Sequence, residues 1–162
     1  MKKKRMIISF DLDGVLFVDP QMVNTEPPLN PLLMRLFPDL LRKGTVSLIN
    51  RLRKDDYAVW VYTSSYRTEF YIRALFRLYG VKFGHIISGF RHDREVQRNR
   101  KERLPAKLPN FYHITLHIDD EERVLRYGKE YGFHVLQISG PDPEWADKIL
   151  NEAGRLRSLM KI

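Results

Sequence analysis

The segment Ile7–Leu16, with the sequence IISFDLDGVL, constrains the fold most. An apolar run with β-branched residues predicts a buried strand over Met6–Asp11, and its near-continuous hydrophobicity predicts a central place in a parallel sheet. Side chains two positions apart in a strand point to the same side, so we expect Asp11 and Asp13 to face one space. Two like charges there are costly unless a cation joins them or one of them is protonated, which indicates chemistry at this strand end.

A second acidic pair strengthens this expectation. The predicted strand Thr115–Ile118 runs directly into Asp119 and Asp120. The carboxyl ends of parallel strands share one edge of a sheet, and ligands bind there at the point where the strand order reverses. If both strands are central and parallel, Asp11, Asp13 and Asp119 converge. Several hard oxygen ligands in one place are typical of a Mg²⁺ site.

Strand and helix patterns alternate along the chain. Pro20, Pro27, Pro28 and Pro31 indicate a loop over residues 17–31. The predicted helices are Leu29–Phe37, Thr45–Lys54, Tyr66–Tyr79, Glu121–Tyr131 and Pro143–Leu159, with Gly154 a candidate break in the last. The further predicted strands are Ala58–Tyr62, Phe83–Ser88 and Phe133–Ile138. We expect Gly80 and Gly132 to end their helices, and Thr63, Ser64 and Ser65 to cap the helix from Tyr66. Arg91–Lys107 has no clear pattern.

This alternation predicts an α/β fold: a doubly wound three-layer α/β/α sandwich with a mainly parallel, Rossmannoid sheet. The length of 162 residues fits a single domain over 1–162, with no room for a large cap.

Composition narrows the classes of function. The net charge of +8 favours anionic partners, although scattered solubilising charge is an equal explanation. Without cysteine there is no disulfide, thiolate metal site or cysteine nucleophile, which is compatible with the cytoplasm. The apolar stretch after the basic N-terminal residues is too short for a signal peptide, and no run is long enough to span a bilayer. We therefore expect a cytoplasmic protein without a membrane partner.

Four motifs follow one another in order: Asp11-Leu12-Asp13-Gly14 after a strand, Thr63 at the end of the next, a downstream lysine, and Asp119-Asp120 after a later strand. This arrangement, over about residues 6–138, resembles the haloacid dehalogenase (HAD) superfamily, and in particular its small uncapped phosphatases. Most of that superfamily are Mg²⁺-dependent phosphohydrolases that pass through an aspartyl-phosphate. The resemblance implies a phosphomonoester hydrolase with Mg²⁺ as its cofactor.

The resemblance also implies a role for each residue. Asp11 would be the nucleophile, and Asp13 the general acid and then the base, its proton retained by a nearby like charge and partial burial. Mg²⁺ would be held by Asp11, the backbone carbonyl of Asp13 and Asp119, with Asp120 either binding through water or capping a helix. Gly14 would allow close backbone approach to the phosphate. The phosphoryl oxygens would be held at a helix N-terminus by Thr63 and the amides of Ser64 and Leu12.

Three questions stay open at this point. The catalytic lysine is Lys107 or, as a competitor, Lys101. The substrate is a phosphorylated small molecule or another anionic phosphomonoester, and transfer to an acceptor other than water is not separated from hydrolysis. The alternative is a HAD-like scaffold that binds nucleic acid or regulates a partner without hydrolysis. Nucleic acid is not favoured, because the basic segment lacks interleaved aromatic residues. The five histidines show no metal spacing and are interpreted as structural.

Overall fold

The computed structural model describes residues 5–98 and 100–160. One parallel sheet runs through them with the strand order β3-β2-β1-β4-β5. The strands are β1 Ile7–Phe10, β2 Ala58–Tyr62, β3 Ile86–Ile87, β4 Leu116–Asp119 and β5 Val135–Gln137. β1 lies at the centre between β2 and β4, which confirms the position predicted from its apolar sequence.

Helices connect the strands. They are α1 Pro31–Leu36, α2 Thr45–Lys54, α3 Glu69–Leu78, α4 Gly89–His92, α5 Glu122–Tyr131 and α6 Trp145–Leu159. A π-helical turn, Asp93–Gln97, continues α4, and a 3-10 helix, Pro109–Tyr112, precedes β4. No helix in the described part of the chain combines the length and apolar character needed to cross a membrane.

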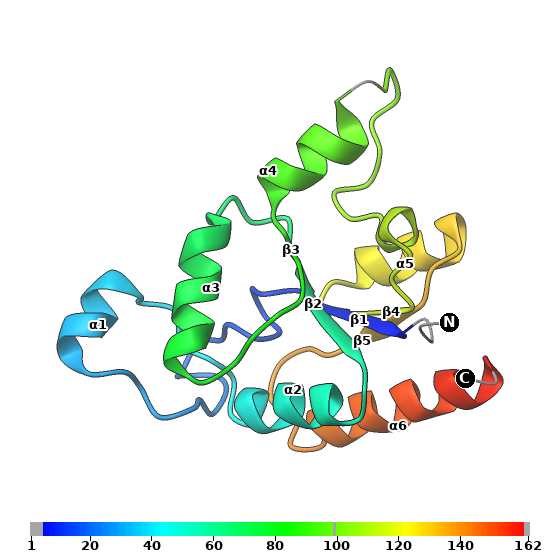
Figure 1. Ribbon diagram of the computed structural model, residues 1–162. Helices are drawn as coiled ribbons and strands as arrows, with labels where there is room; N and C mark the ends of the chain where they lie inside the picture. The colour runs from blue at the N-terminus through cyan, green and yellow to red at the C-terminus, as the bar shows by residue number, and fades with distance from the viewer. Residues whose placement is uncertain (1–4, 99, 161–162) are drawn as a thin grey trace.

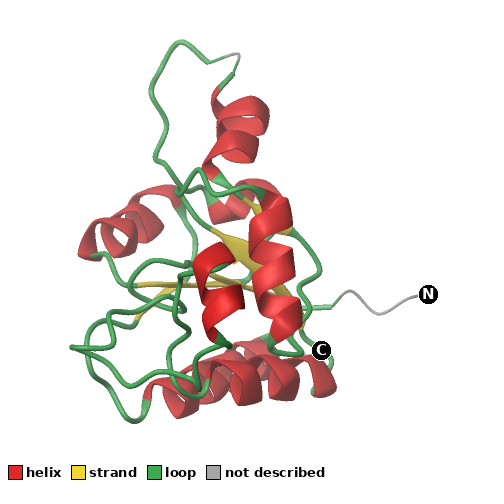
Figure 2. Ribbon diagram, turned by 90° about the vertical axis from the view of Figure 1, so that its left-hand side faces the viewer, coloured by secondary structure: helices red, strands yellow, loops and turns green. Residues whose placement is uncertain are grey.

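The two sheet faces carry different residues because side chains alternate along each strand. Ile8 and Phe10 belong to the main core, which also includes buried residues of α2, α3 and α6. The opposite face packs against α5 and the 3-10 helix through smaller clusters. Figures 1 and 2 show helices on both sides of the sheet, so the predicted doubly wound α/β architecture is confirmed.

No domain-sized insertion interrupts the described chain. The connection from β1 to β2 contains only α1, α2 and loops, and the sheet edge carries no large cap, as predicted. One segment stands out from the rest of the fold: α4, the π-helical turn and the loop that follows project beyond the sheet in both views (Figures 1 and 2). We call the described residues 89–98 and 100–106 the arm. The assignment of residues 1–162 to a single domain stays a prediction.

Some predicted boundaries were wrong. The helix predicted from Tyr66 begins at Glu69, because the side chain of Thr68 accepts the hydrogen bond from the Tyr71 amide and caps the first turn. The candidate break at Gly154 is absent, since buried side chains on either side hold α6 against the core. Gly80 and Gly132 both follow helix ends with positive φ, as predicted.

A buried arginine ties the loop after β1 to the rest of the fold. Arg42 is 2% exposed, and its guanidinium donates to the carbonyl oxygens of Val15 at 2.7 Å, Gly140 at 2.9 Å and Gly14 at 3.0 Å. It also lies over the ring of Trp145 at 5.3 Å. Because the loop after β1 carries Asp11 and Asp13, this side chain helps to fix the position of the acidic motif.

We expect Arg42→Leu to lower the free energy of unfolding by about 3 kcal/mol, because three carbonyl groups lose a charged donor in a buried site. Urea denaturation measures this. The matched control is Arg35→Leu at an exposed position of α1, which should change stability little. Equal stability of the two variants would contradict the anchoring role of Arg42.

Candidate active site

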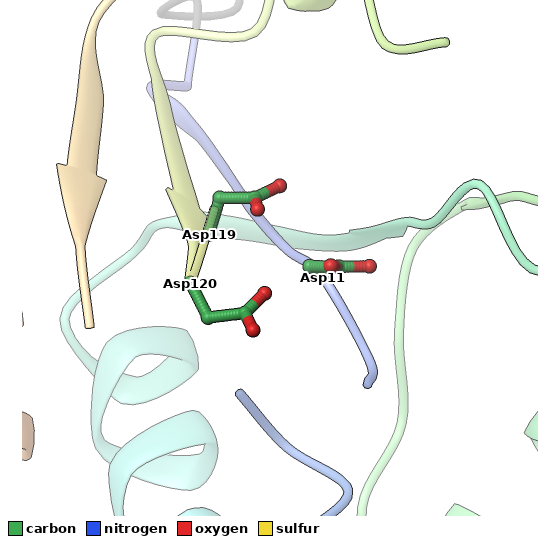
Figure 3. A group of neighbouring side chains, drawn as sticks. All are labelled: Asp11, Asp119 and Asp120. Carbon is green, nitrogen blue, oxygen red and sulfur yellow. The ribbon is translucent and has the colours of Figure 1, made fainter. Parts of the chain in front are cut away.

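Three carboxylates meet at the carboxyl edge of the sheet. Asp11 follows β1, Asp119 ends β4 and Asp120 comes next, and each offers an oxygen within 4.8 Å of the others. Figure 3 shows the carboxylates of Asp119 and Asp120 turned from the end of β4 toward Asp11. β1 and β4 are the neighbours at which the strand order reverses, so the convergence predicted from the sequence holds for these residues.

A buried lysine lies among these carboxylates. The Nζ atom of Lys107 is 2.7 Å from Oδ2 of Asp11 and 2.6 Å from Oδ2 of Asp119. Lys107 is 2% exposed, and the two carboxylates are almost fully buried. Its competitor Lys101 is exposed and has no ion-pair partner among the described residues. The geometry therefore brings Lys107, and not Lys101, to the acidic cluster.

The sequence analysis missed one member of this network. His117 is fully buried on β4, and its Nε2 is 2.8 Å from Oδ2 of Asp119. Its Nδ1 is 2.8 Å from the hydroxyl of the buried Ser9 on β1. With Nε2–H donating to the carboxylate, Nδ1 accepts from Ser9, so the two strands fix the orientation of Asp119. The spacing of His117 and Asp119, two apart on one strand, was the available signal.

Burial and neighbouring charges shift the pKa values of the ionisable groups in the acidic cluster. Burial would lower the pKa of Lys107, but the charges of Asp11 and Asp119 outweigh it and hold this pKa above its ordinary value. Burial would raise the pKa of Asp119, but the contacts of His117 and Lys107 hold it well below its usual range. The pKa of Asp11 is raised, mainly by burial and against the charge of Lys107. The pKa of Asp120 rises to about 6 through burial and the charges of Asp119 and Asp11.

Asp13 does not join the cluster through its side chain, so that prediction was wrong. Its carboxylate is 60% exposed and forms a two-pronged ion pair with Arg67, at 2.8 Å and 2.9 Å. The strand argument fails because β1 ends at Phe10, so regular alternation does not extend to Asp13. The expected like-charge neighbour and partial burial are replaced by an arginine and solvent exposure.

Arg67 is a second residue that the sequence analysis missed. Its guanidinium also contacts Asp39, through NH2 at 2.9 Å and Nε at 3.0 Å, and lies over the ring of Phe17 at 5.0 Å. Tyr71 donates to the same Asp39 carboxylate at 2.8 Å. Arg67 therefore links the loop after β1 to the loop after β2 in a fixed geometry. The spacing of residues along the chain does not indicate this contact, because Asp13, Asp39 and Arg67 lie on three loops that come together only in the folded protein.

The residues predicted to hold a phosphoryl group lie at neighbouring strand ends. Phe10 of β1 pairs with Val61 of β2, so the loops carrying Leu12 and Thr63 leave the sheet side by side. Thr63 is 1% exposed, and its hydroxyl accepts from the Ser65 amide at 3.1 Å, while Ser64 is exposed. The predicted helix N-terminus at this point was wrong, because α3 begins only at Glu69.

Two further expectations about the acidic loops have clear outcomes. Asp120 does not cap α5; instead Asp119 accepts from the Glu121 amide at 3.0 Å. Gly14 has φ of +80°, and a Cβ there would lie 2.2 Å from Oδ2 of Asp120. A glycine is needed at this position to let the backbone approach the Asp120 carboxylate.

In chelator-treated protein, the repulsion at Asp120 should appear as a pH-dependent loss of stability. A folded-state pKa of about 6, above the ordinary 3.8, means that the folded protein binds this proton more tightly than the unfolded chain does. The contribution of Asp120 therefore falls as pH rises from about 4 to about 6, and is constant above. The gain in stability of Asp120→Asn over the natural chain, measured by urea denaturation, should grow across this range. A gain that does not depend on pH would contradict the placement of Asp120 in a partly buried site beside Asp119 and Asp11.

Comparison with known proteins identifies the fold. No family model matches the chain, and no curated protein is similar to it in sequence. A HAD-superfamily hydrolase of subfamily IA from Geobacter sulfurreducens superposes with a TM-score of 0.55 at 16% identity, over 89% of this chain and 99% of that one. A predicted HAD-like hydrolase from Porphyromonas gingivalis gives 0.54 at 17% identity, over 92% and 98%. The D,D-heptose bisphosphate phosphatase from B. bronchiseptica, solved with magnesium and phosphate, gives 0.54 at 16% identity, over 91% and 86%. The chain therefore has the fold of the HAD-superfamily hydrolases.

Proposed function

We propose that this protein is a Mg²⁺-dependent phosphomonoester hydrolase that works through an aspartyl-phosphate on Asp11. The observation that carries the proposal is the cluster of Asp11, Asp119 and Asp120 around the buried Lys107 at the reversal point of the sheet. The HAD-like fold adds support, because the heptose bisphosphate phosphatase of the same fold was solved with magnesium and phosphate.

The chemistry of the cluster fits a divalent ion. Asp11, Asp119 and Asp120 are hard oxygen donors close enough to share one ion, and their charges exceed the single charge of Lys107. We propose that these carboxylates hold Mg²⁺ together with the backbone carbonyl of Asp13. The bound ion would offset the repulsion between an anionic nucleophile and an anionic phosphate.

The reaction would proceed in two displacements at phosphorus. In the first, a carboxylate oxygen of Asp11 forms a bond to phosphorus and the ester oxygen leaves, taking a proton from Asp13. In the second, water attacks the phosphorus of the aspartyl-phosphate and gives a proton to Asp13. The Asp11–phosphorus bond breaks, which restores the carboxylate and releases inorganic phosphate.

Neighbouring groups hold the carboxylates of Asp11 and Asp13 in different ways. Lys107 on Oδ2 and the Leu12 amide on Oδ1, at 2.8 Å, hold the orientation of the Asp11 carboxylate. Lys107 would also attract the phosphoryl oxygens. Both oxygens of Asp13 contact Arg67, so at least one of these contacts must break before Asp13 reaches a leaving group.

The groups that would hold the transferring phosphate are Thr63, Ser64, Gly14 and the Leu12 amide, on the loops after β1 and β2. The Leu12 amide must turn from Asp11 to do so. Transfer of the phosphoryl group to an acceptor other than water would begin with the same attack of Asp11 on phosphorus. The assay must therefore measure the release of inorganic phosphate, which only hydrolysis gives. The cytoplasmic location stays a prediction.

A panel of phosphomonoesters with Mg²⁺ tests the assignment. We expect release of inorganic phosphate that stops with EDTA and returns when Mg²⁺ is restored. Phosphate release that is unaffected by chelation, or none from any substrate including p-nitrophenyl phosphate, would contradict it.

The Asp11→Asn variant should lose activity by about 10⁴-fold or more, because the attacking oxygen and a metal ligand are removed together. Its steady-state rate on p-nitrophenyl phosphate with Mg²⁺ measures this. The matched control is Asp19→Asn at an exposed position of the loop that follows, which should keep full activity. Substantial activity in Asp11→Asn would remove Asp11 as the nucleophile.

Asp13→Asn should give a different kinetic signature. Nitrophenolate leaves without a proton, so the first displacement persists and releases about one equivalent of nitrophenol, while hydrolysis of the aspartyl-phosphate slows by about 10²–10⁴-fold. Stopped-flow absorbance should show this burst in Asp13→Asn and not in Asp11→Asn. With an alkyl phosphate, whose leaving group needs the proton, we expect no burst. A burst that is the same for both esters would exclude Asp13 as the acid.

A further inference from the structure

A large cavity adjoins the proposed phosphate-binding loop. It has a volume of about 870 Å³ and is lined by Ser64 and Tyr66 together with residues of the arm and of α5. Ser64 is next to Thr63 in the chain, and the lining residue Ala106 is next to Lys107. A substrate whose phosphate lies at the acidic cluster would therefore extend its leaving group into this cavity. The volume suits an organic group much larger than a triose or hexose.

The arm that forms one wall is attached firmly at its base. The Gly89 amide donates to the Ser65 carbonyl at 2.8 Å, and a Cβ at Gly89 would lie 2.6 Å from the Ser64 carbonyl. At the other end, the Leu108 amide donates to the Tyr62 hydroxyl at 2.8 Å, and that hydroxyl also contacts Nδ1 of His92. The cavity therefore lies in a fixed position beside the acidic cluster.

Aromatic rings supply flat surfaces to the cavity. Tyr66 is 56% exposed although its hydroxyl is bonded to Asp93 and its ring packs edge-on against Phe90, with centroids 4.7 Å apart. Its ring is thus exposed and held in one orientation. Tyr127 and Tyr131 of α5 add a second pair, 6.3 Å apart. Exposed rings held in place are surfaces on which a planar base can stack.

The charged side chains of the arm indicate which chemical groups a ligand would carry in addition to a planar ring. Two of the three acidic side chains of the arm have partners: Asp93 accepts from Tyr66, and Glu95 pairs with Arg91 at 3.0 Å and accepts from Tyr112 at 2.8 Å. The third, Glu102, is exposed and offsets one positive charge. Within residues 5–98 and 100–160, five cations of the arm have no acidic partner, namely Arg94, Arg98, Arg100, Lys101 and Arg103. Five unpaired cations among the described residues of the arm, against one unpaired acid, favour a partner with several negative charges.

We propose, on the basis of the proposed function, that the substrate is the phosphorylated end of a nucleic-acid strand. The terminal base stacks on the tyrosines of the cavity, and the following phosphates lie along the cations of the arm. The aromatic residues that the basic segment lacks in sequence are supplied by the loop after β2 and by α5. A sugar phosphate would leave these rings and cations without partners, and a free mononucleotide would leave most of the cations unused.

The test compares phosphate release from a phosphate-ended oligonucleotide, the matching mononucleotide, a hexose phosphate and p-nitrophenyl phosphate. We expect the highest kcat/KM for the oligonucleotide. Tyr66→Leu and Arg103→Ala should each raise its KM about tenfold and leave kcat/KM for the hexose phosphate, which has neither a planar ring nor a further phosphate, unchanged. The matched controls are Phe70→Leu and Arg126→Ala, which replace exposed residues outside the cavity lining and should change neither.

Binding gives a readout that does not depend on turnover. Anisotropy of a labelled strand, with Asp11→Asn protein to prevent hydrolysis, should show tighter binding of the phosphate-ended strand than of the hydroxyl-ended one. Its affinity should weaken about tenfold or more between 50 and 200 mM salt.

Each of the following results overturns the nucleic-acid proposal, the proposed hydrolase function or both. Equal kcat/KM for the mononucleotide and the oligonucleotide would assign the cavity to a free nucleotide. A preference for the hexose phosphate, or equal effects of the cavity variants on all substrates, would remove the nucleic acid. If no phosphomonoester is hydrolysed but end-specific, salt-dependent binding persists, the proposed hydrolase fails and the binding site stands; without that binding both fail.

Discussion

The buried charge balance at Lys107 is the interaction on which the rest of the site depends. One ammonium lies between Oδ2 of Asp11 and Oδ2 of Asp119, in a place where water is excluded. Removing either partner from such a group leaves an unpaired buried charge, which is costly. Burial raises the pKa of Asp120 to about 6, and the negative charges of Asp119 and Asp11 add to this effect even with Lys107 in place. A divalent cation would complete the balance.

The position of the acidic cluster follows from the strand order of the sheet. Crossovers in opposite directions from the central pair of strands leave β1 and β4 adjacent, so residues more than a hundred positions apart share one edge. His117 and Ser9, on the face opposite the main core, link the same two strands and orient Asp119. The polar network thus lies on the α5 side of the sheet, while α2, α3 and α6 cover the other face with apolar contacts.

The features that could be predicted from the sequence are those that depend on the residue pattern within one segment of the chain. The central strand, the sheet class and the convergence of Asp11 with Asp119 followed from hydrophobic runs and from the rule that parallel strands share an edge. Lys107 was a candidate only through the resemblance to the HAD superfamily, and the fold places it between these two carboxylates. The side chain of Asp13 was misplaced because the strand rule was extended beyond the end of β1. Arg67 was missed since its partners come from two distant loops. The tyrosines that line the cavity were missed for the same reason. The spacing of residues within one segment does not show which other segment packs against it.

The most direct measurement of the central claim is a calorimetric titration of Mg²⁺ at neutral pH into the chelator-treated protein. We expect one ion per chain, binding that is lost in Asp119→Asn, and binding that is retained in Asp39→Asn, whose carboxylate contacts Arg67 outside the cluster. Absence of binding in the natural chain, or unchanged binding in Asp119→Asn, would contradict the claim that the carboxylates of the two strand ends form a divalent metal site.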